Sequence, residues 1–232
     1  SYYAIAGSYF ATDSVSQAAA RFGNNETDGF NVGTISGRFG WNLENDINLD
    51  YVFRITNAEV EIDNWDFGAP NPIDNLNRSN ISDNFANRVQ LSKLAMDGRL
   101  EHKAAFSLTS YKRQDTNVPN TFWASIYNGE TRLFDYQANY AWNDNNLITA
   151  GVSYQDEEAS SDLQSLVNQT STGVFLEDRI TLKDNWHATA GVRWDEFSRA
   201  GEANTYRFST IYYLEEKPAH LHASLGTGFR AP

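Results

Sequence analysis

The sequence predicts an all-β fold, an antiparallel transmembrane β-barrel of about eleven strands. Three observations predict it: apolar and polar residues alternate almost everywhere, the strands run to about ten to thirteen residues, and short turns alternate with longer loops. A tilted strand needs about 9–11 residues to cross the hydrocarbon of a membrane, with an apolar outer face and a polar inner face. A soluble β-sandwich, the alternative, has strands nearer about five or six residues. The strand length therefore favours the barrel.

The alternation locates each strand in turn. Ile47, Leu49, Tyr51, Phe53 and Ile55, for example, share one face of a strand whose other face is largely polar. Strands are expected near residues 2–11, 30–42, 47–62, 84–96, 100–112, 130–142, 147–156, 170–182, 186–198, 204–214 and 219–230. Longer loops are expected near residues 12–29, 63–83, 113–129, 157–169 and 199–203, and short polar turns such as 97–98 lie between them. Every other hairpin is therefore predicted to be tight.

The alternation also assigns the two faces of the predicted barrel wall. The residues expected to contact lipid are Phe39, Phe53, Phe106, Leu108, Tyr140, Val152 and Val192. Tyr and Trp at strand ends are typical of the aromatic girdles at the membrane interfaces. The inward-facing arginines Arg38, Arg54, Arg193 and Arg207 are expected to pair with acidic residues such as Asp50, Asp135 and Asp195.

Composition excludes several classes of function. The 232 residues carry a formal charge of −12, which argues against nucleic acid as a partner because phosphate binding needs clustered Lys and Arg. There is no cysteine, so a disulfide scaffold and thiol catalysis are excluded. No nucleophile elbow is present, and we expect the protein not to be an enzyme.

The last residues, Leu225-Gly226-Thr227-Gly228-Phe229-Arg230-Ala231-Pro232, resemble the Gly-x-Gly-Phe-(Arg/Lys)-Ala-Pro strand of TonB-dependent outer-membrane receptor barrels. The segments 173–178 and 189–195 resemble the two strands that precede it in that family. The resemblance implies that residues 1–232 form one partial barrel domain, about half of a 22-stranded barrel whose plug domain is not present in this chain. It also implies a location in the bacterial outer membrane, with outer-membrane lipid around the barrel.

Within the family, the segments 11–18 and 25–30 resemble the cobalamin (vitamin B12) receptor branch. This resemblance implies active uptake of a scarce bulky nutrient, favouring cobalamin or another corrinoid, energised by the TonB complex through the plug. A ferric-siderophore or haem receptor of the same family is the first alternative. A passive porin is the second, and it would need no plug.

Carboxylates gather in two neighbouring long loops. Asp13, Glu26 and Asp28 lie in the first loop, and the second includes Asp63, Asp66 and Asp74. Adjacent long loops of a barrel leave the same rim, so the two groups are expected to converge, and calcium prefers six to eight oxygen ligands. On the resemblance, calcium binding is assigned to Asp13, Glu26, Asp28, Asp63 and Asp74. The alternative is solvated surface charge, which is common in an acidic protein.

Aromatic residues in the predicted loops are candidates for contact with the ligand. They are Trp65, Phe67, Phe122, Trp123 and Tyr127. Rigid aromatic side chains in loops often mark a recognition surface. The alternative is that they pack against neighbouring loops and close the mouth of the barrel.

Overall fold

The computed structural model describes residues 1–232 apart from positions 14, 17, 19, 23–25, 66–71, 74, 76, 118–124, 163, 216 and 230–232. At positions 22, 64, 65, 72, 73 and 117 it describes the backbone alone.

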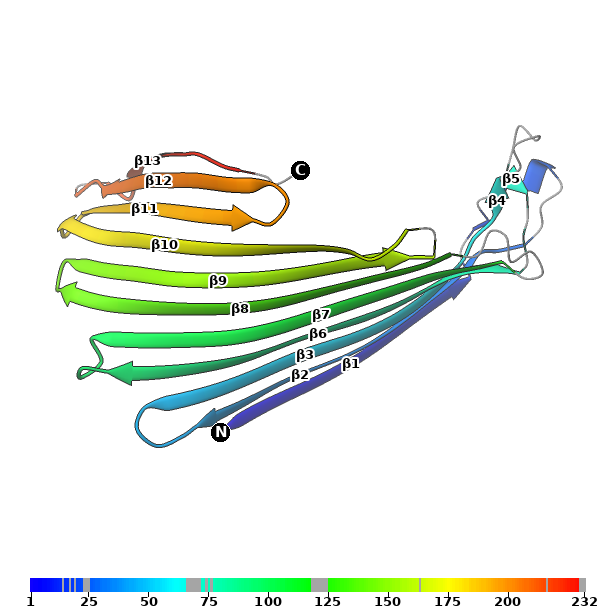
Figure 1. Cartoon of the computed structure of the whole chain (residues 1–232), viewed down its shortest axis with the longest axis horizontal. Helices are drawn as coiled ribbons and strands as arrows, with labels where there is room; N and C mark the ends of the chain where they lie inside the picture. Colours follow the sequence, from blue (N-terminus) through cyan, green and yellow to red (C-terminus); the bar gives the residue numbers. More distant parts are fainter. Residues whose placement is uncertain are drawn as a thin grey trace.

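Eleven strands form one antiparallel sheet in which each strand pairs with its neighbours in chain order (Figure 1). They are β1 (Tyr2–Asp13), β2 (Gly29–Asn42), β3 (Ile47–Glu61), β6 (Arg78–Ala95), β7 (Leu100–Asn117), β8 (Ser125–Asn143), β9 (Asn146–Ser161), β10 (Val167–Lys183), β11 (Trp186–Phe197), β12 (Gly201–Tyr213) and β13 (His220–Gly226). A second sheet of two short strands, β4 (Asn64–Trp65) and β5 (Pro72–Ile73), lies with the 3-10 turn η1 (Ala20–Phe22) at one end of the molecule. The antiparallel all-β prediction is confirmed.

The register separates an apolar face of the sheet from a polar one. Tyr3, Phe39, Tyr51, Val89 and Phe106 are paired across β1, β2, β3, β6 and β7, so their side chains share one face. The pairing extends this apolar face through the remaining strands to β13. All seven residues expected to contact lipid lie on it, namely Phe39, Phe53, Phe106, Leu108, Tyr140, Val152 and Val192.

The part of the sheet that the structure describes buries no hydrophobic core of the kind found in a soluble domain. Among the described residues, the buried apolar side chains are four alanines: Ala18, Ala105, Ala188 and Ala203. Large apolar side chains on the apolar face stay exposed instead, and Tyr3 is 78% exposed. The accessible surface is 15573 Å², whereas a compact soluble protein of 26.1 kDa has about 10,600 Å². The described residues therefore leave the apolar face uncovered.

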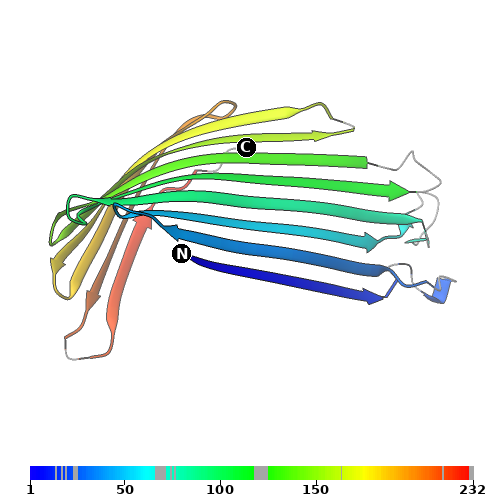
Figure 2. The same cartoon turned by 90° about the horizontal axis from the view of Figure 1, so that it is seen from below.

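The sheet is curved but open. Figure 2 shows it bent into a trough, and β1 and β13 are its outermost strands. Each of these strands pairs on one side only in the part of the chain that the structure describes. No helix among the described residues is long and apolar enough to cross a membrane.

Several strands are longer than the sequence predicts. β6 begins at Arg78 rather than near residue 84, and β7 extends to Asn117. The reason is that the outward side chains become polar near the long-loop end, as at Lys112, so the alternation that marks a membrane strand stops before the strand does. The strands of the main sheet differ in length, with 19 residues in β8, 12 in β11 and 7 in β13.

One loop prediction is wrong. The segment 199–203 was expected to be a long loop, but β11 ends at Phe197 and β12 begins at Gly201, leaving a tight turn of three residues. Gly201 has a φ of +79°, which glycine adopts without the strain that a side chain would add. The alternation of short turns and long loops therefore ends before this hairpin.

Candidate metal centre

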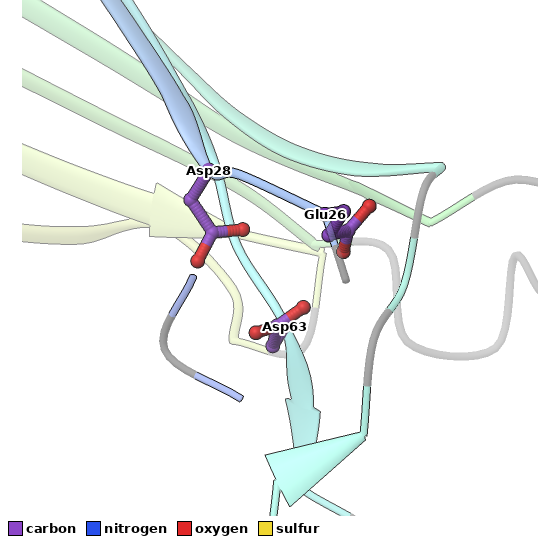
Figure 3. A group of neighbouring side chains, drawn as sticks. All are labelled: Glu26, Asp28 and Asp63. Carbon is purple, nitrogen blue, oxygen red and sulfur yellow. The ribbon is translucent and has the colours of Figure 1, made fainter. Parts of the chain in front are cut away.

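Three of the predicted carboxylates meet at the long-loop end of the sheet. Asp28 directly precedes β2 and Asp63 follows the end of β3, and these strands are antiparallel neighbours whose register pairs Phe30 with Val60. The start of β2 and the end of β3 therefore lie side by side. Carboxylate oxygens of Glu26, Asp28 and Asp63, one from each residue, lie within 4.8 Å of one another (Figure 3). We call these three residues the acidic cluster.

The acidic cluster is largely removed from water. Asp28 is 8% exposed and Asp63 is 6% exposed. Burial and the proximity of like charges both disfavour three ionised carboxylates, unless hydrogen-bond donors or a cation offset them. Carboxylate oxygens are the donors that calcium prefers, and three carboxylates provide up to six. The donor set fits a hard divalent cation.

Asp63 connects the two long loops through its side chain. Its Oδ2 accepts hydrogen bonds from the backbone N–H of Ala18 at 2.7 Å and from the Ser16 hydroxyl at 3.1 Å. Its Oδ1 accepts a hydrogen bond from the backbone N–H of Asn75 at 3.2 Å. One carboxylate thus satisfies donors from the loop that precedes β2 and from the loop that precedes β6.

An ion pair that sequence analysis missed contacts the backbone of Asp63. Arg78 donates two hydrogen bonds to the carboxylate of Asp115, from Nε at 3.1 Å and from Nη2 at 2.8 Å. Its Nη1 donates to the backbone carbonyl oxygen of Asp63 at 3.2 Å. Asp115 is 8% exposed, and the pair joins the start of β6 to the end of β7. Both residues were assigned to loops in the sequence, where no register could pair them.

The other two predicted calcium ligands are not placed in the acidic cluster. Asp13 is the last residue of β1, where it pairs with Gly29 in the register and is exposed. Asp74 lies outside the described residues, as does Asp66.

Of the predicted aromatic contacts, only Tyr127 has a described side chain. It lies in β8 rather than in a loop, and it is 43% exposed. Trp65 belongs to β4, where the backbone alone is described. Phe67, Phe122 and Trp123 lie outside the described residues.

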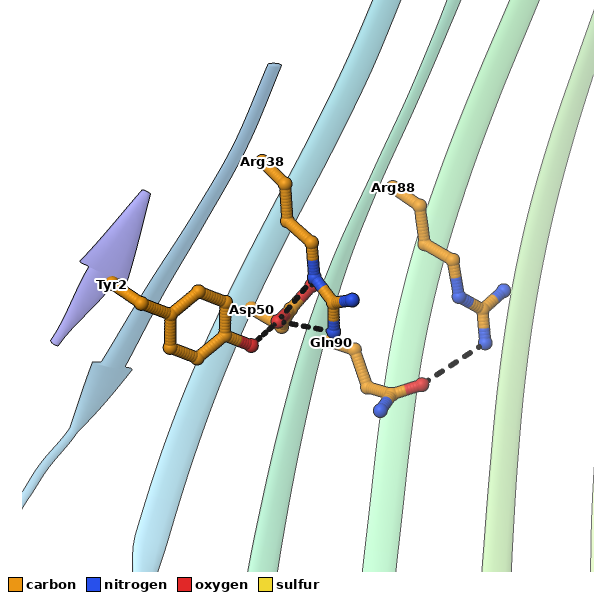
Figure 4. A network of polar contacts seen from close by, with 5 residues as sticks. All are labelled: Tyr2, Arg38, Asp50, Arg88 and Gln90. Atoms are coloured by element: carbon orange, nitrogen blue, oxygen red, sulfur yellow. Dashed lines mark hydrogen bonds and ion pairs between the residues drawn. The ribbon is translucent and has the colours of Figure 1, made fainter. Parts of the chain in front are cut away.

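The polar face of the sheet carries cross-strand ion pairs far from the acidic cluster. Arg38 donates to both carboxylate oxygens of Asp50 at 3.0 and 3.1 Å from Nε, and the Tyr2 hydroxyl donates to the same carboxylate (Figure 4). Arg193 likewise pairs with Asp195 at 2.6 Å. These two pairs match the sequence-based expectation for inward-facing arginines.

Two other pairs on the polar face differ from the expected partners. Asp135 accepts from Arg88 at 3.0 and 3.1 Å, and Arg88 also lies beside Gln90 in Figure 4. Arg207 pairs with Glu177. In each of these four pairs on the polar face, an arginine and a carboxylate compensate each other's charge.

The comparisons with known proteins agree with this architecture. A family model described as "TonB dependent receptor-like, beta-barrel" matches residues 2–232. No protein with a curated description matches the chain.

Solved structures show the same fold at low sequence identity. The siderophore receptor PirA from Acinetobacter baumannii is similar with a TM-score of 0.78 and 14% identity, over 99% of this chain and 38% of that one. The siderophore receptor PirA from Pseudomonas aeruginosa is similar with a TM-score of 0.72 and 14% identity, over 88% of this chain and 34% of that one. The FrpB iron transporter from Neisseria meningitidis is similar with a TM-score of 0.72 and 13% identity, over 96% of this chain and 41% of that one.

This chain thus spans well under half the length of each of these solved chains. The register, the exposed apolar face and the match over residues 2–232 lead to one assignment. The chain belongs to the TonB-dependent receptor family and corresponds to part of its β-barrel.

Proposed function

We propose that the intact protein is an active-transport receptor of the bacterial outer membrane, energised through the TonB complex. Its family consists of outer-membrane transport receptors rather than enzymes. The exposed apolar face supports a surrounding shell of outer-membrane lipid, because such a face is stable only in an apolar solvent. The family assignment favours an energised receptor over a passive porin.

We further propose that the ligand is cobalamin or a related corrinoid and that calcium binds at the mouth. The single observation that carries this proposal is the acidic cluster, whose donor set suits calcium. Glu26, Asp28 and Asp63 would hold the ion, with Asp13 and Asp74 as the further ligands that the sequence suggests. Bound calcium would supply the positive charge that offsets the repulsion among the three carboxylates.

The residues of this chain determine what calcium binding does to the mouth. Asp63 holds the loop that precedes β2 through Ser16 and Ala18, so fixing its carboxylate also fixes that loop. The aromatic residues Trp65, Phe67, Phe122, Trp123 and Tyr127 remain the proposed contacts for the ligand. Ordering the loops beforehand raises the affinity for any ligand that recognises the ordered state.

A ferric-siderophore receptor is the second candidate. The observation that favours it is that two of the similar solved structures are described as siderophore receptors. At 14% identity these structures support the fold alone and do not transfer a ligand. The acidic cluster supports the first proposal over the second, because an anionic chelate gains no direct attraction from carboxylates at the mouth.

Competition binding on the intact protein tests the ligand. Cyanocobalamin and a ferric siderophore are each titrated with calcium and with excess chelator. Tight cyanocobalamin binding that weakens in chelator supports the corrinoid proposal. Siderophore binding that is indifferent to calcium favours the second candidate and refutes the first.

A further inference from the structure

We infer that Arg78 and Asp115 act as positioning residues that hold the Asp63 carboxylate in place for cation binding at the mouth. Neither residue belongs to the acidic cluster, so they would act through Asp63 and not as ligands. The part of this inference that concerns a cation rests on the proposed calcium site. The part that concerns the position of Asp63 stands on the contacts of Arg78 alone.

The first step is the geometry of the ion pair. Arg78 and Asp115 form a two-bond, parallel contact, the arrangement that fixes a guanidinium most strongly in both distance and orientation. Their side chains are 22% and 11% exposed, so water competes little for these hydrogen bonds. The guanidinium is therefore fixed relative to β7, an 18-residue strand in the middle of the sheet.

The second step runs from the guanidinium to Asp63. A further donor of Arg78, Nη1, is hydrogen-bonded to the carbonyl oxygen of Asp63 at 3.2 Å. Asp63 lies beyond the end of β3, so the ladder of the main sheet no longer holds it. A neighbouring backbone contact, from the Ile62 N–H to the Arg78 carbonyl at 3.1 Å, ties the same stretch to β6. Arg78 thus fixes the backbone from which the Asp63 carboxylate extends.

The third step is the consequence for cation binding. A coordinating carboxylate that shifts by a fraction of an ångström binds the metal less strongly. Removing a group that orients such a ligand typically lowers metal affinity about 10- to 100-fold. Asp63 also accepts the Ala18 and Asn75 amides, so its displacement would release both loops. The ion pair between β6 and β7 would therefore keep the two loops at the mouth ordered through its contact with Asp63.

The test uses the intact receptor with three variants: Arg78→Gln, Asp115→Asn and the double variant. The matched control is Arg88→Gln, which breaks an equivalent two-bond pair with Asp135 elsewhere on β6, with no contact to Asp63. Calcium affinity is measured by calorimetry. Amide hydrogen exchange at Ala18 and Asn75 is measured without calcium. Heat-modifiable migration on gels confirms that each variant folds.

We expect each single variant to weaken calcium binding about 10-fold or more, and the double variant to lose little beyond the worse single one. Exchange at Ala18 and Asn75 should accelerate, and Arg88→Gln should change neither quantity. Calcium affinity and amide exchange equal to the wild type in Arg78→Gln would overturn the inference. Wild-type protein that binds no calcium, yet shows faster exchange in Arg78→Gln, would reject the proposed calcium site and leave the positioning of Asp63 supported.

A charge-reversed pair, Arg78→Asp with Asp115→Arg, separates positioning from mere stabilisation. It keeps an ion pair between β6 and β7 but removes the donor to the Asp63 carbonyl. We expect this variant to fold but to bind calcium more weakly than the wild type does. Recovery of wild-type affinity would show that the pair matters only for stability and would overturn the inference. If this variant does not fold, the Arg78→Gln measurements decide alone.

Discussion

Buried charge is concentrated at one end of a sheet that otherwise buries few side chains. The buried polar residues that the structure describes are Asp28, Asp63, Asn80 and Asp115, and all four lie at the long-loop end. Ionised groups are costly to bury unless their partners are in place. Such a concentration is therefore a more informative sign of function than the abundant exposed acids of a chain with a net charge of −12.

Removing two carboxylates of the acidic cluster should abolish the effect of calcium on ligand affinity. In the intact receptor, Asp28→Asn with Asp63→Asn removes two negative charges but leaves an amide oxygen at each position. We expect the effect of calcium on cyanocobalamin affinity, about 10-fold for an ordinary coupling, to disappear while folding is retained. Asp83→Asn is the control, because Asp83 accepts from Asn57 and lies outside the acidic cluster. A persistent calcium effect in the double variant would contradict the assignment.

The apolar face gives a second prediction for single residues. Val152→Arg and Val192→Arg each place a charge among acyl chains and should cost about 2–4 kcal/mol at the middle of the bilayer. Ser209→Arg, on the polar face, should cost much less. Denaturant titration of the intact receptor in lipid vesicles measures all three. Equal stability of both valine variants and the wild type would show that the two faces are assigned the wrong way round.

The strands and their order were predictable from the sequence because period-two alternation is a direct consequence of strand geometry between lipid and water. The strand ends near the long loops were not. Above the membrane both faces of a strand meet water, so the outward residues of β7 become Ser110, Lys112 and Gln114, and the apolar signal disappears. Arg78 and Asp115 fall in these segments. Their pairing depends on the register of β6 and β7, which the composition of the segments does not encode.

Close packing within the sheet gives a prediction for β9 and β10. The Phe175 ring lies over Gly151, where an added Cβ would stand 2.5 Å from the ring and 2.7 Å from the Tyr136 carbonyl oxygen. The backbone atom cannot move away cheaply, so Gly151→Ala should destabilise the sheet by about 1–3 kcal/mol. Gly129→Ala is the control, since its added Cβ would meet its nearest atom, a backbone oxygen, at 3.9 Å. The temperature at which the folded gel band of the intact receptor disappears compares them, and no difference would refute this packing argument.

For the whole molecule, the open sheet should not be stable by itself. The outermost strands β1 and β13 each pair on one side only among the described residues. Unpaired backbone groups at membrane depth cost several kcal/mol each. Residues 1–232 expressed alone should therefore form no stable monomeric barrel. We expect the same gel mobility before and after boiling, and a faster-migrating unboiled band would contradict the prediction.

The unequal strand lengths imply a barrel segment with an oblique rim. At about 3.3 Å per residue, the 19 residues of β8 extend about 63 Å, and the 12 residues of β11 about 40 Å. With the short turns level, and a tilt of about 40°, the β8 side stands roughly 18 Å taller than the β11 side. If the intact protein is the proposed receptor, a bulky ligand would pass most easily from the side over the lower edge at β11 and β12.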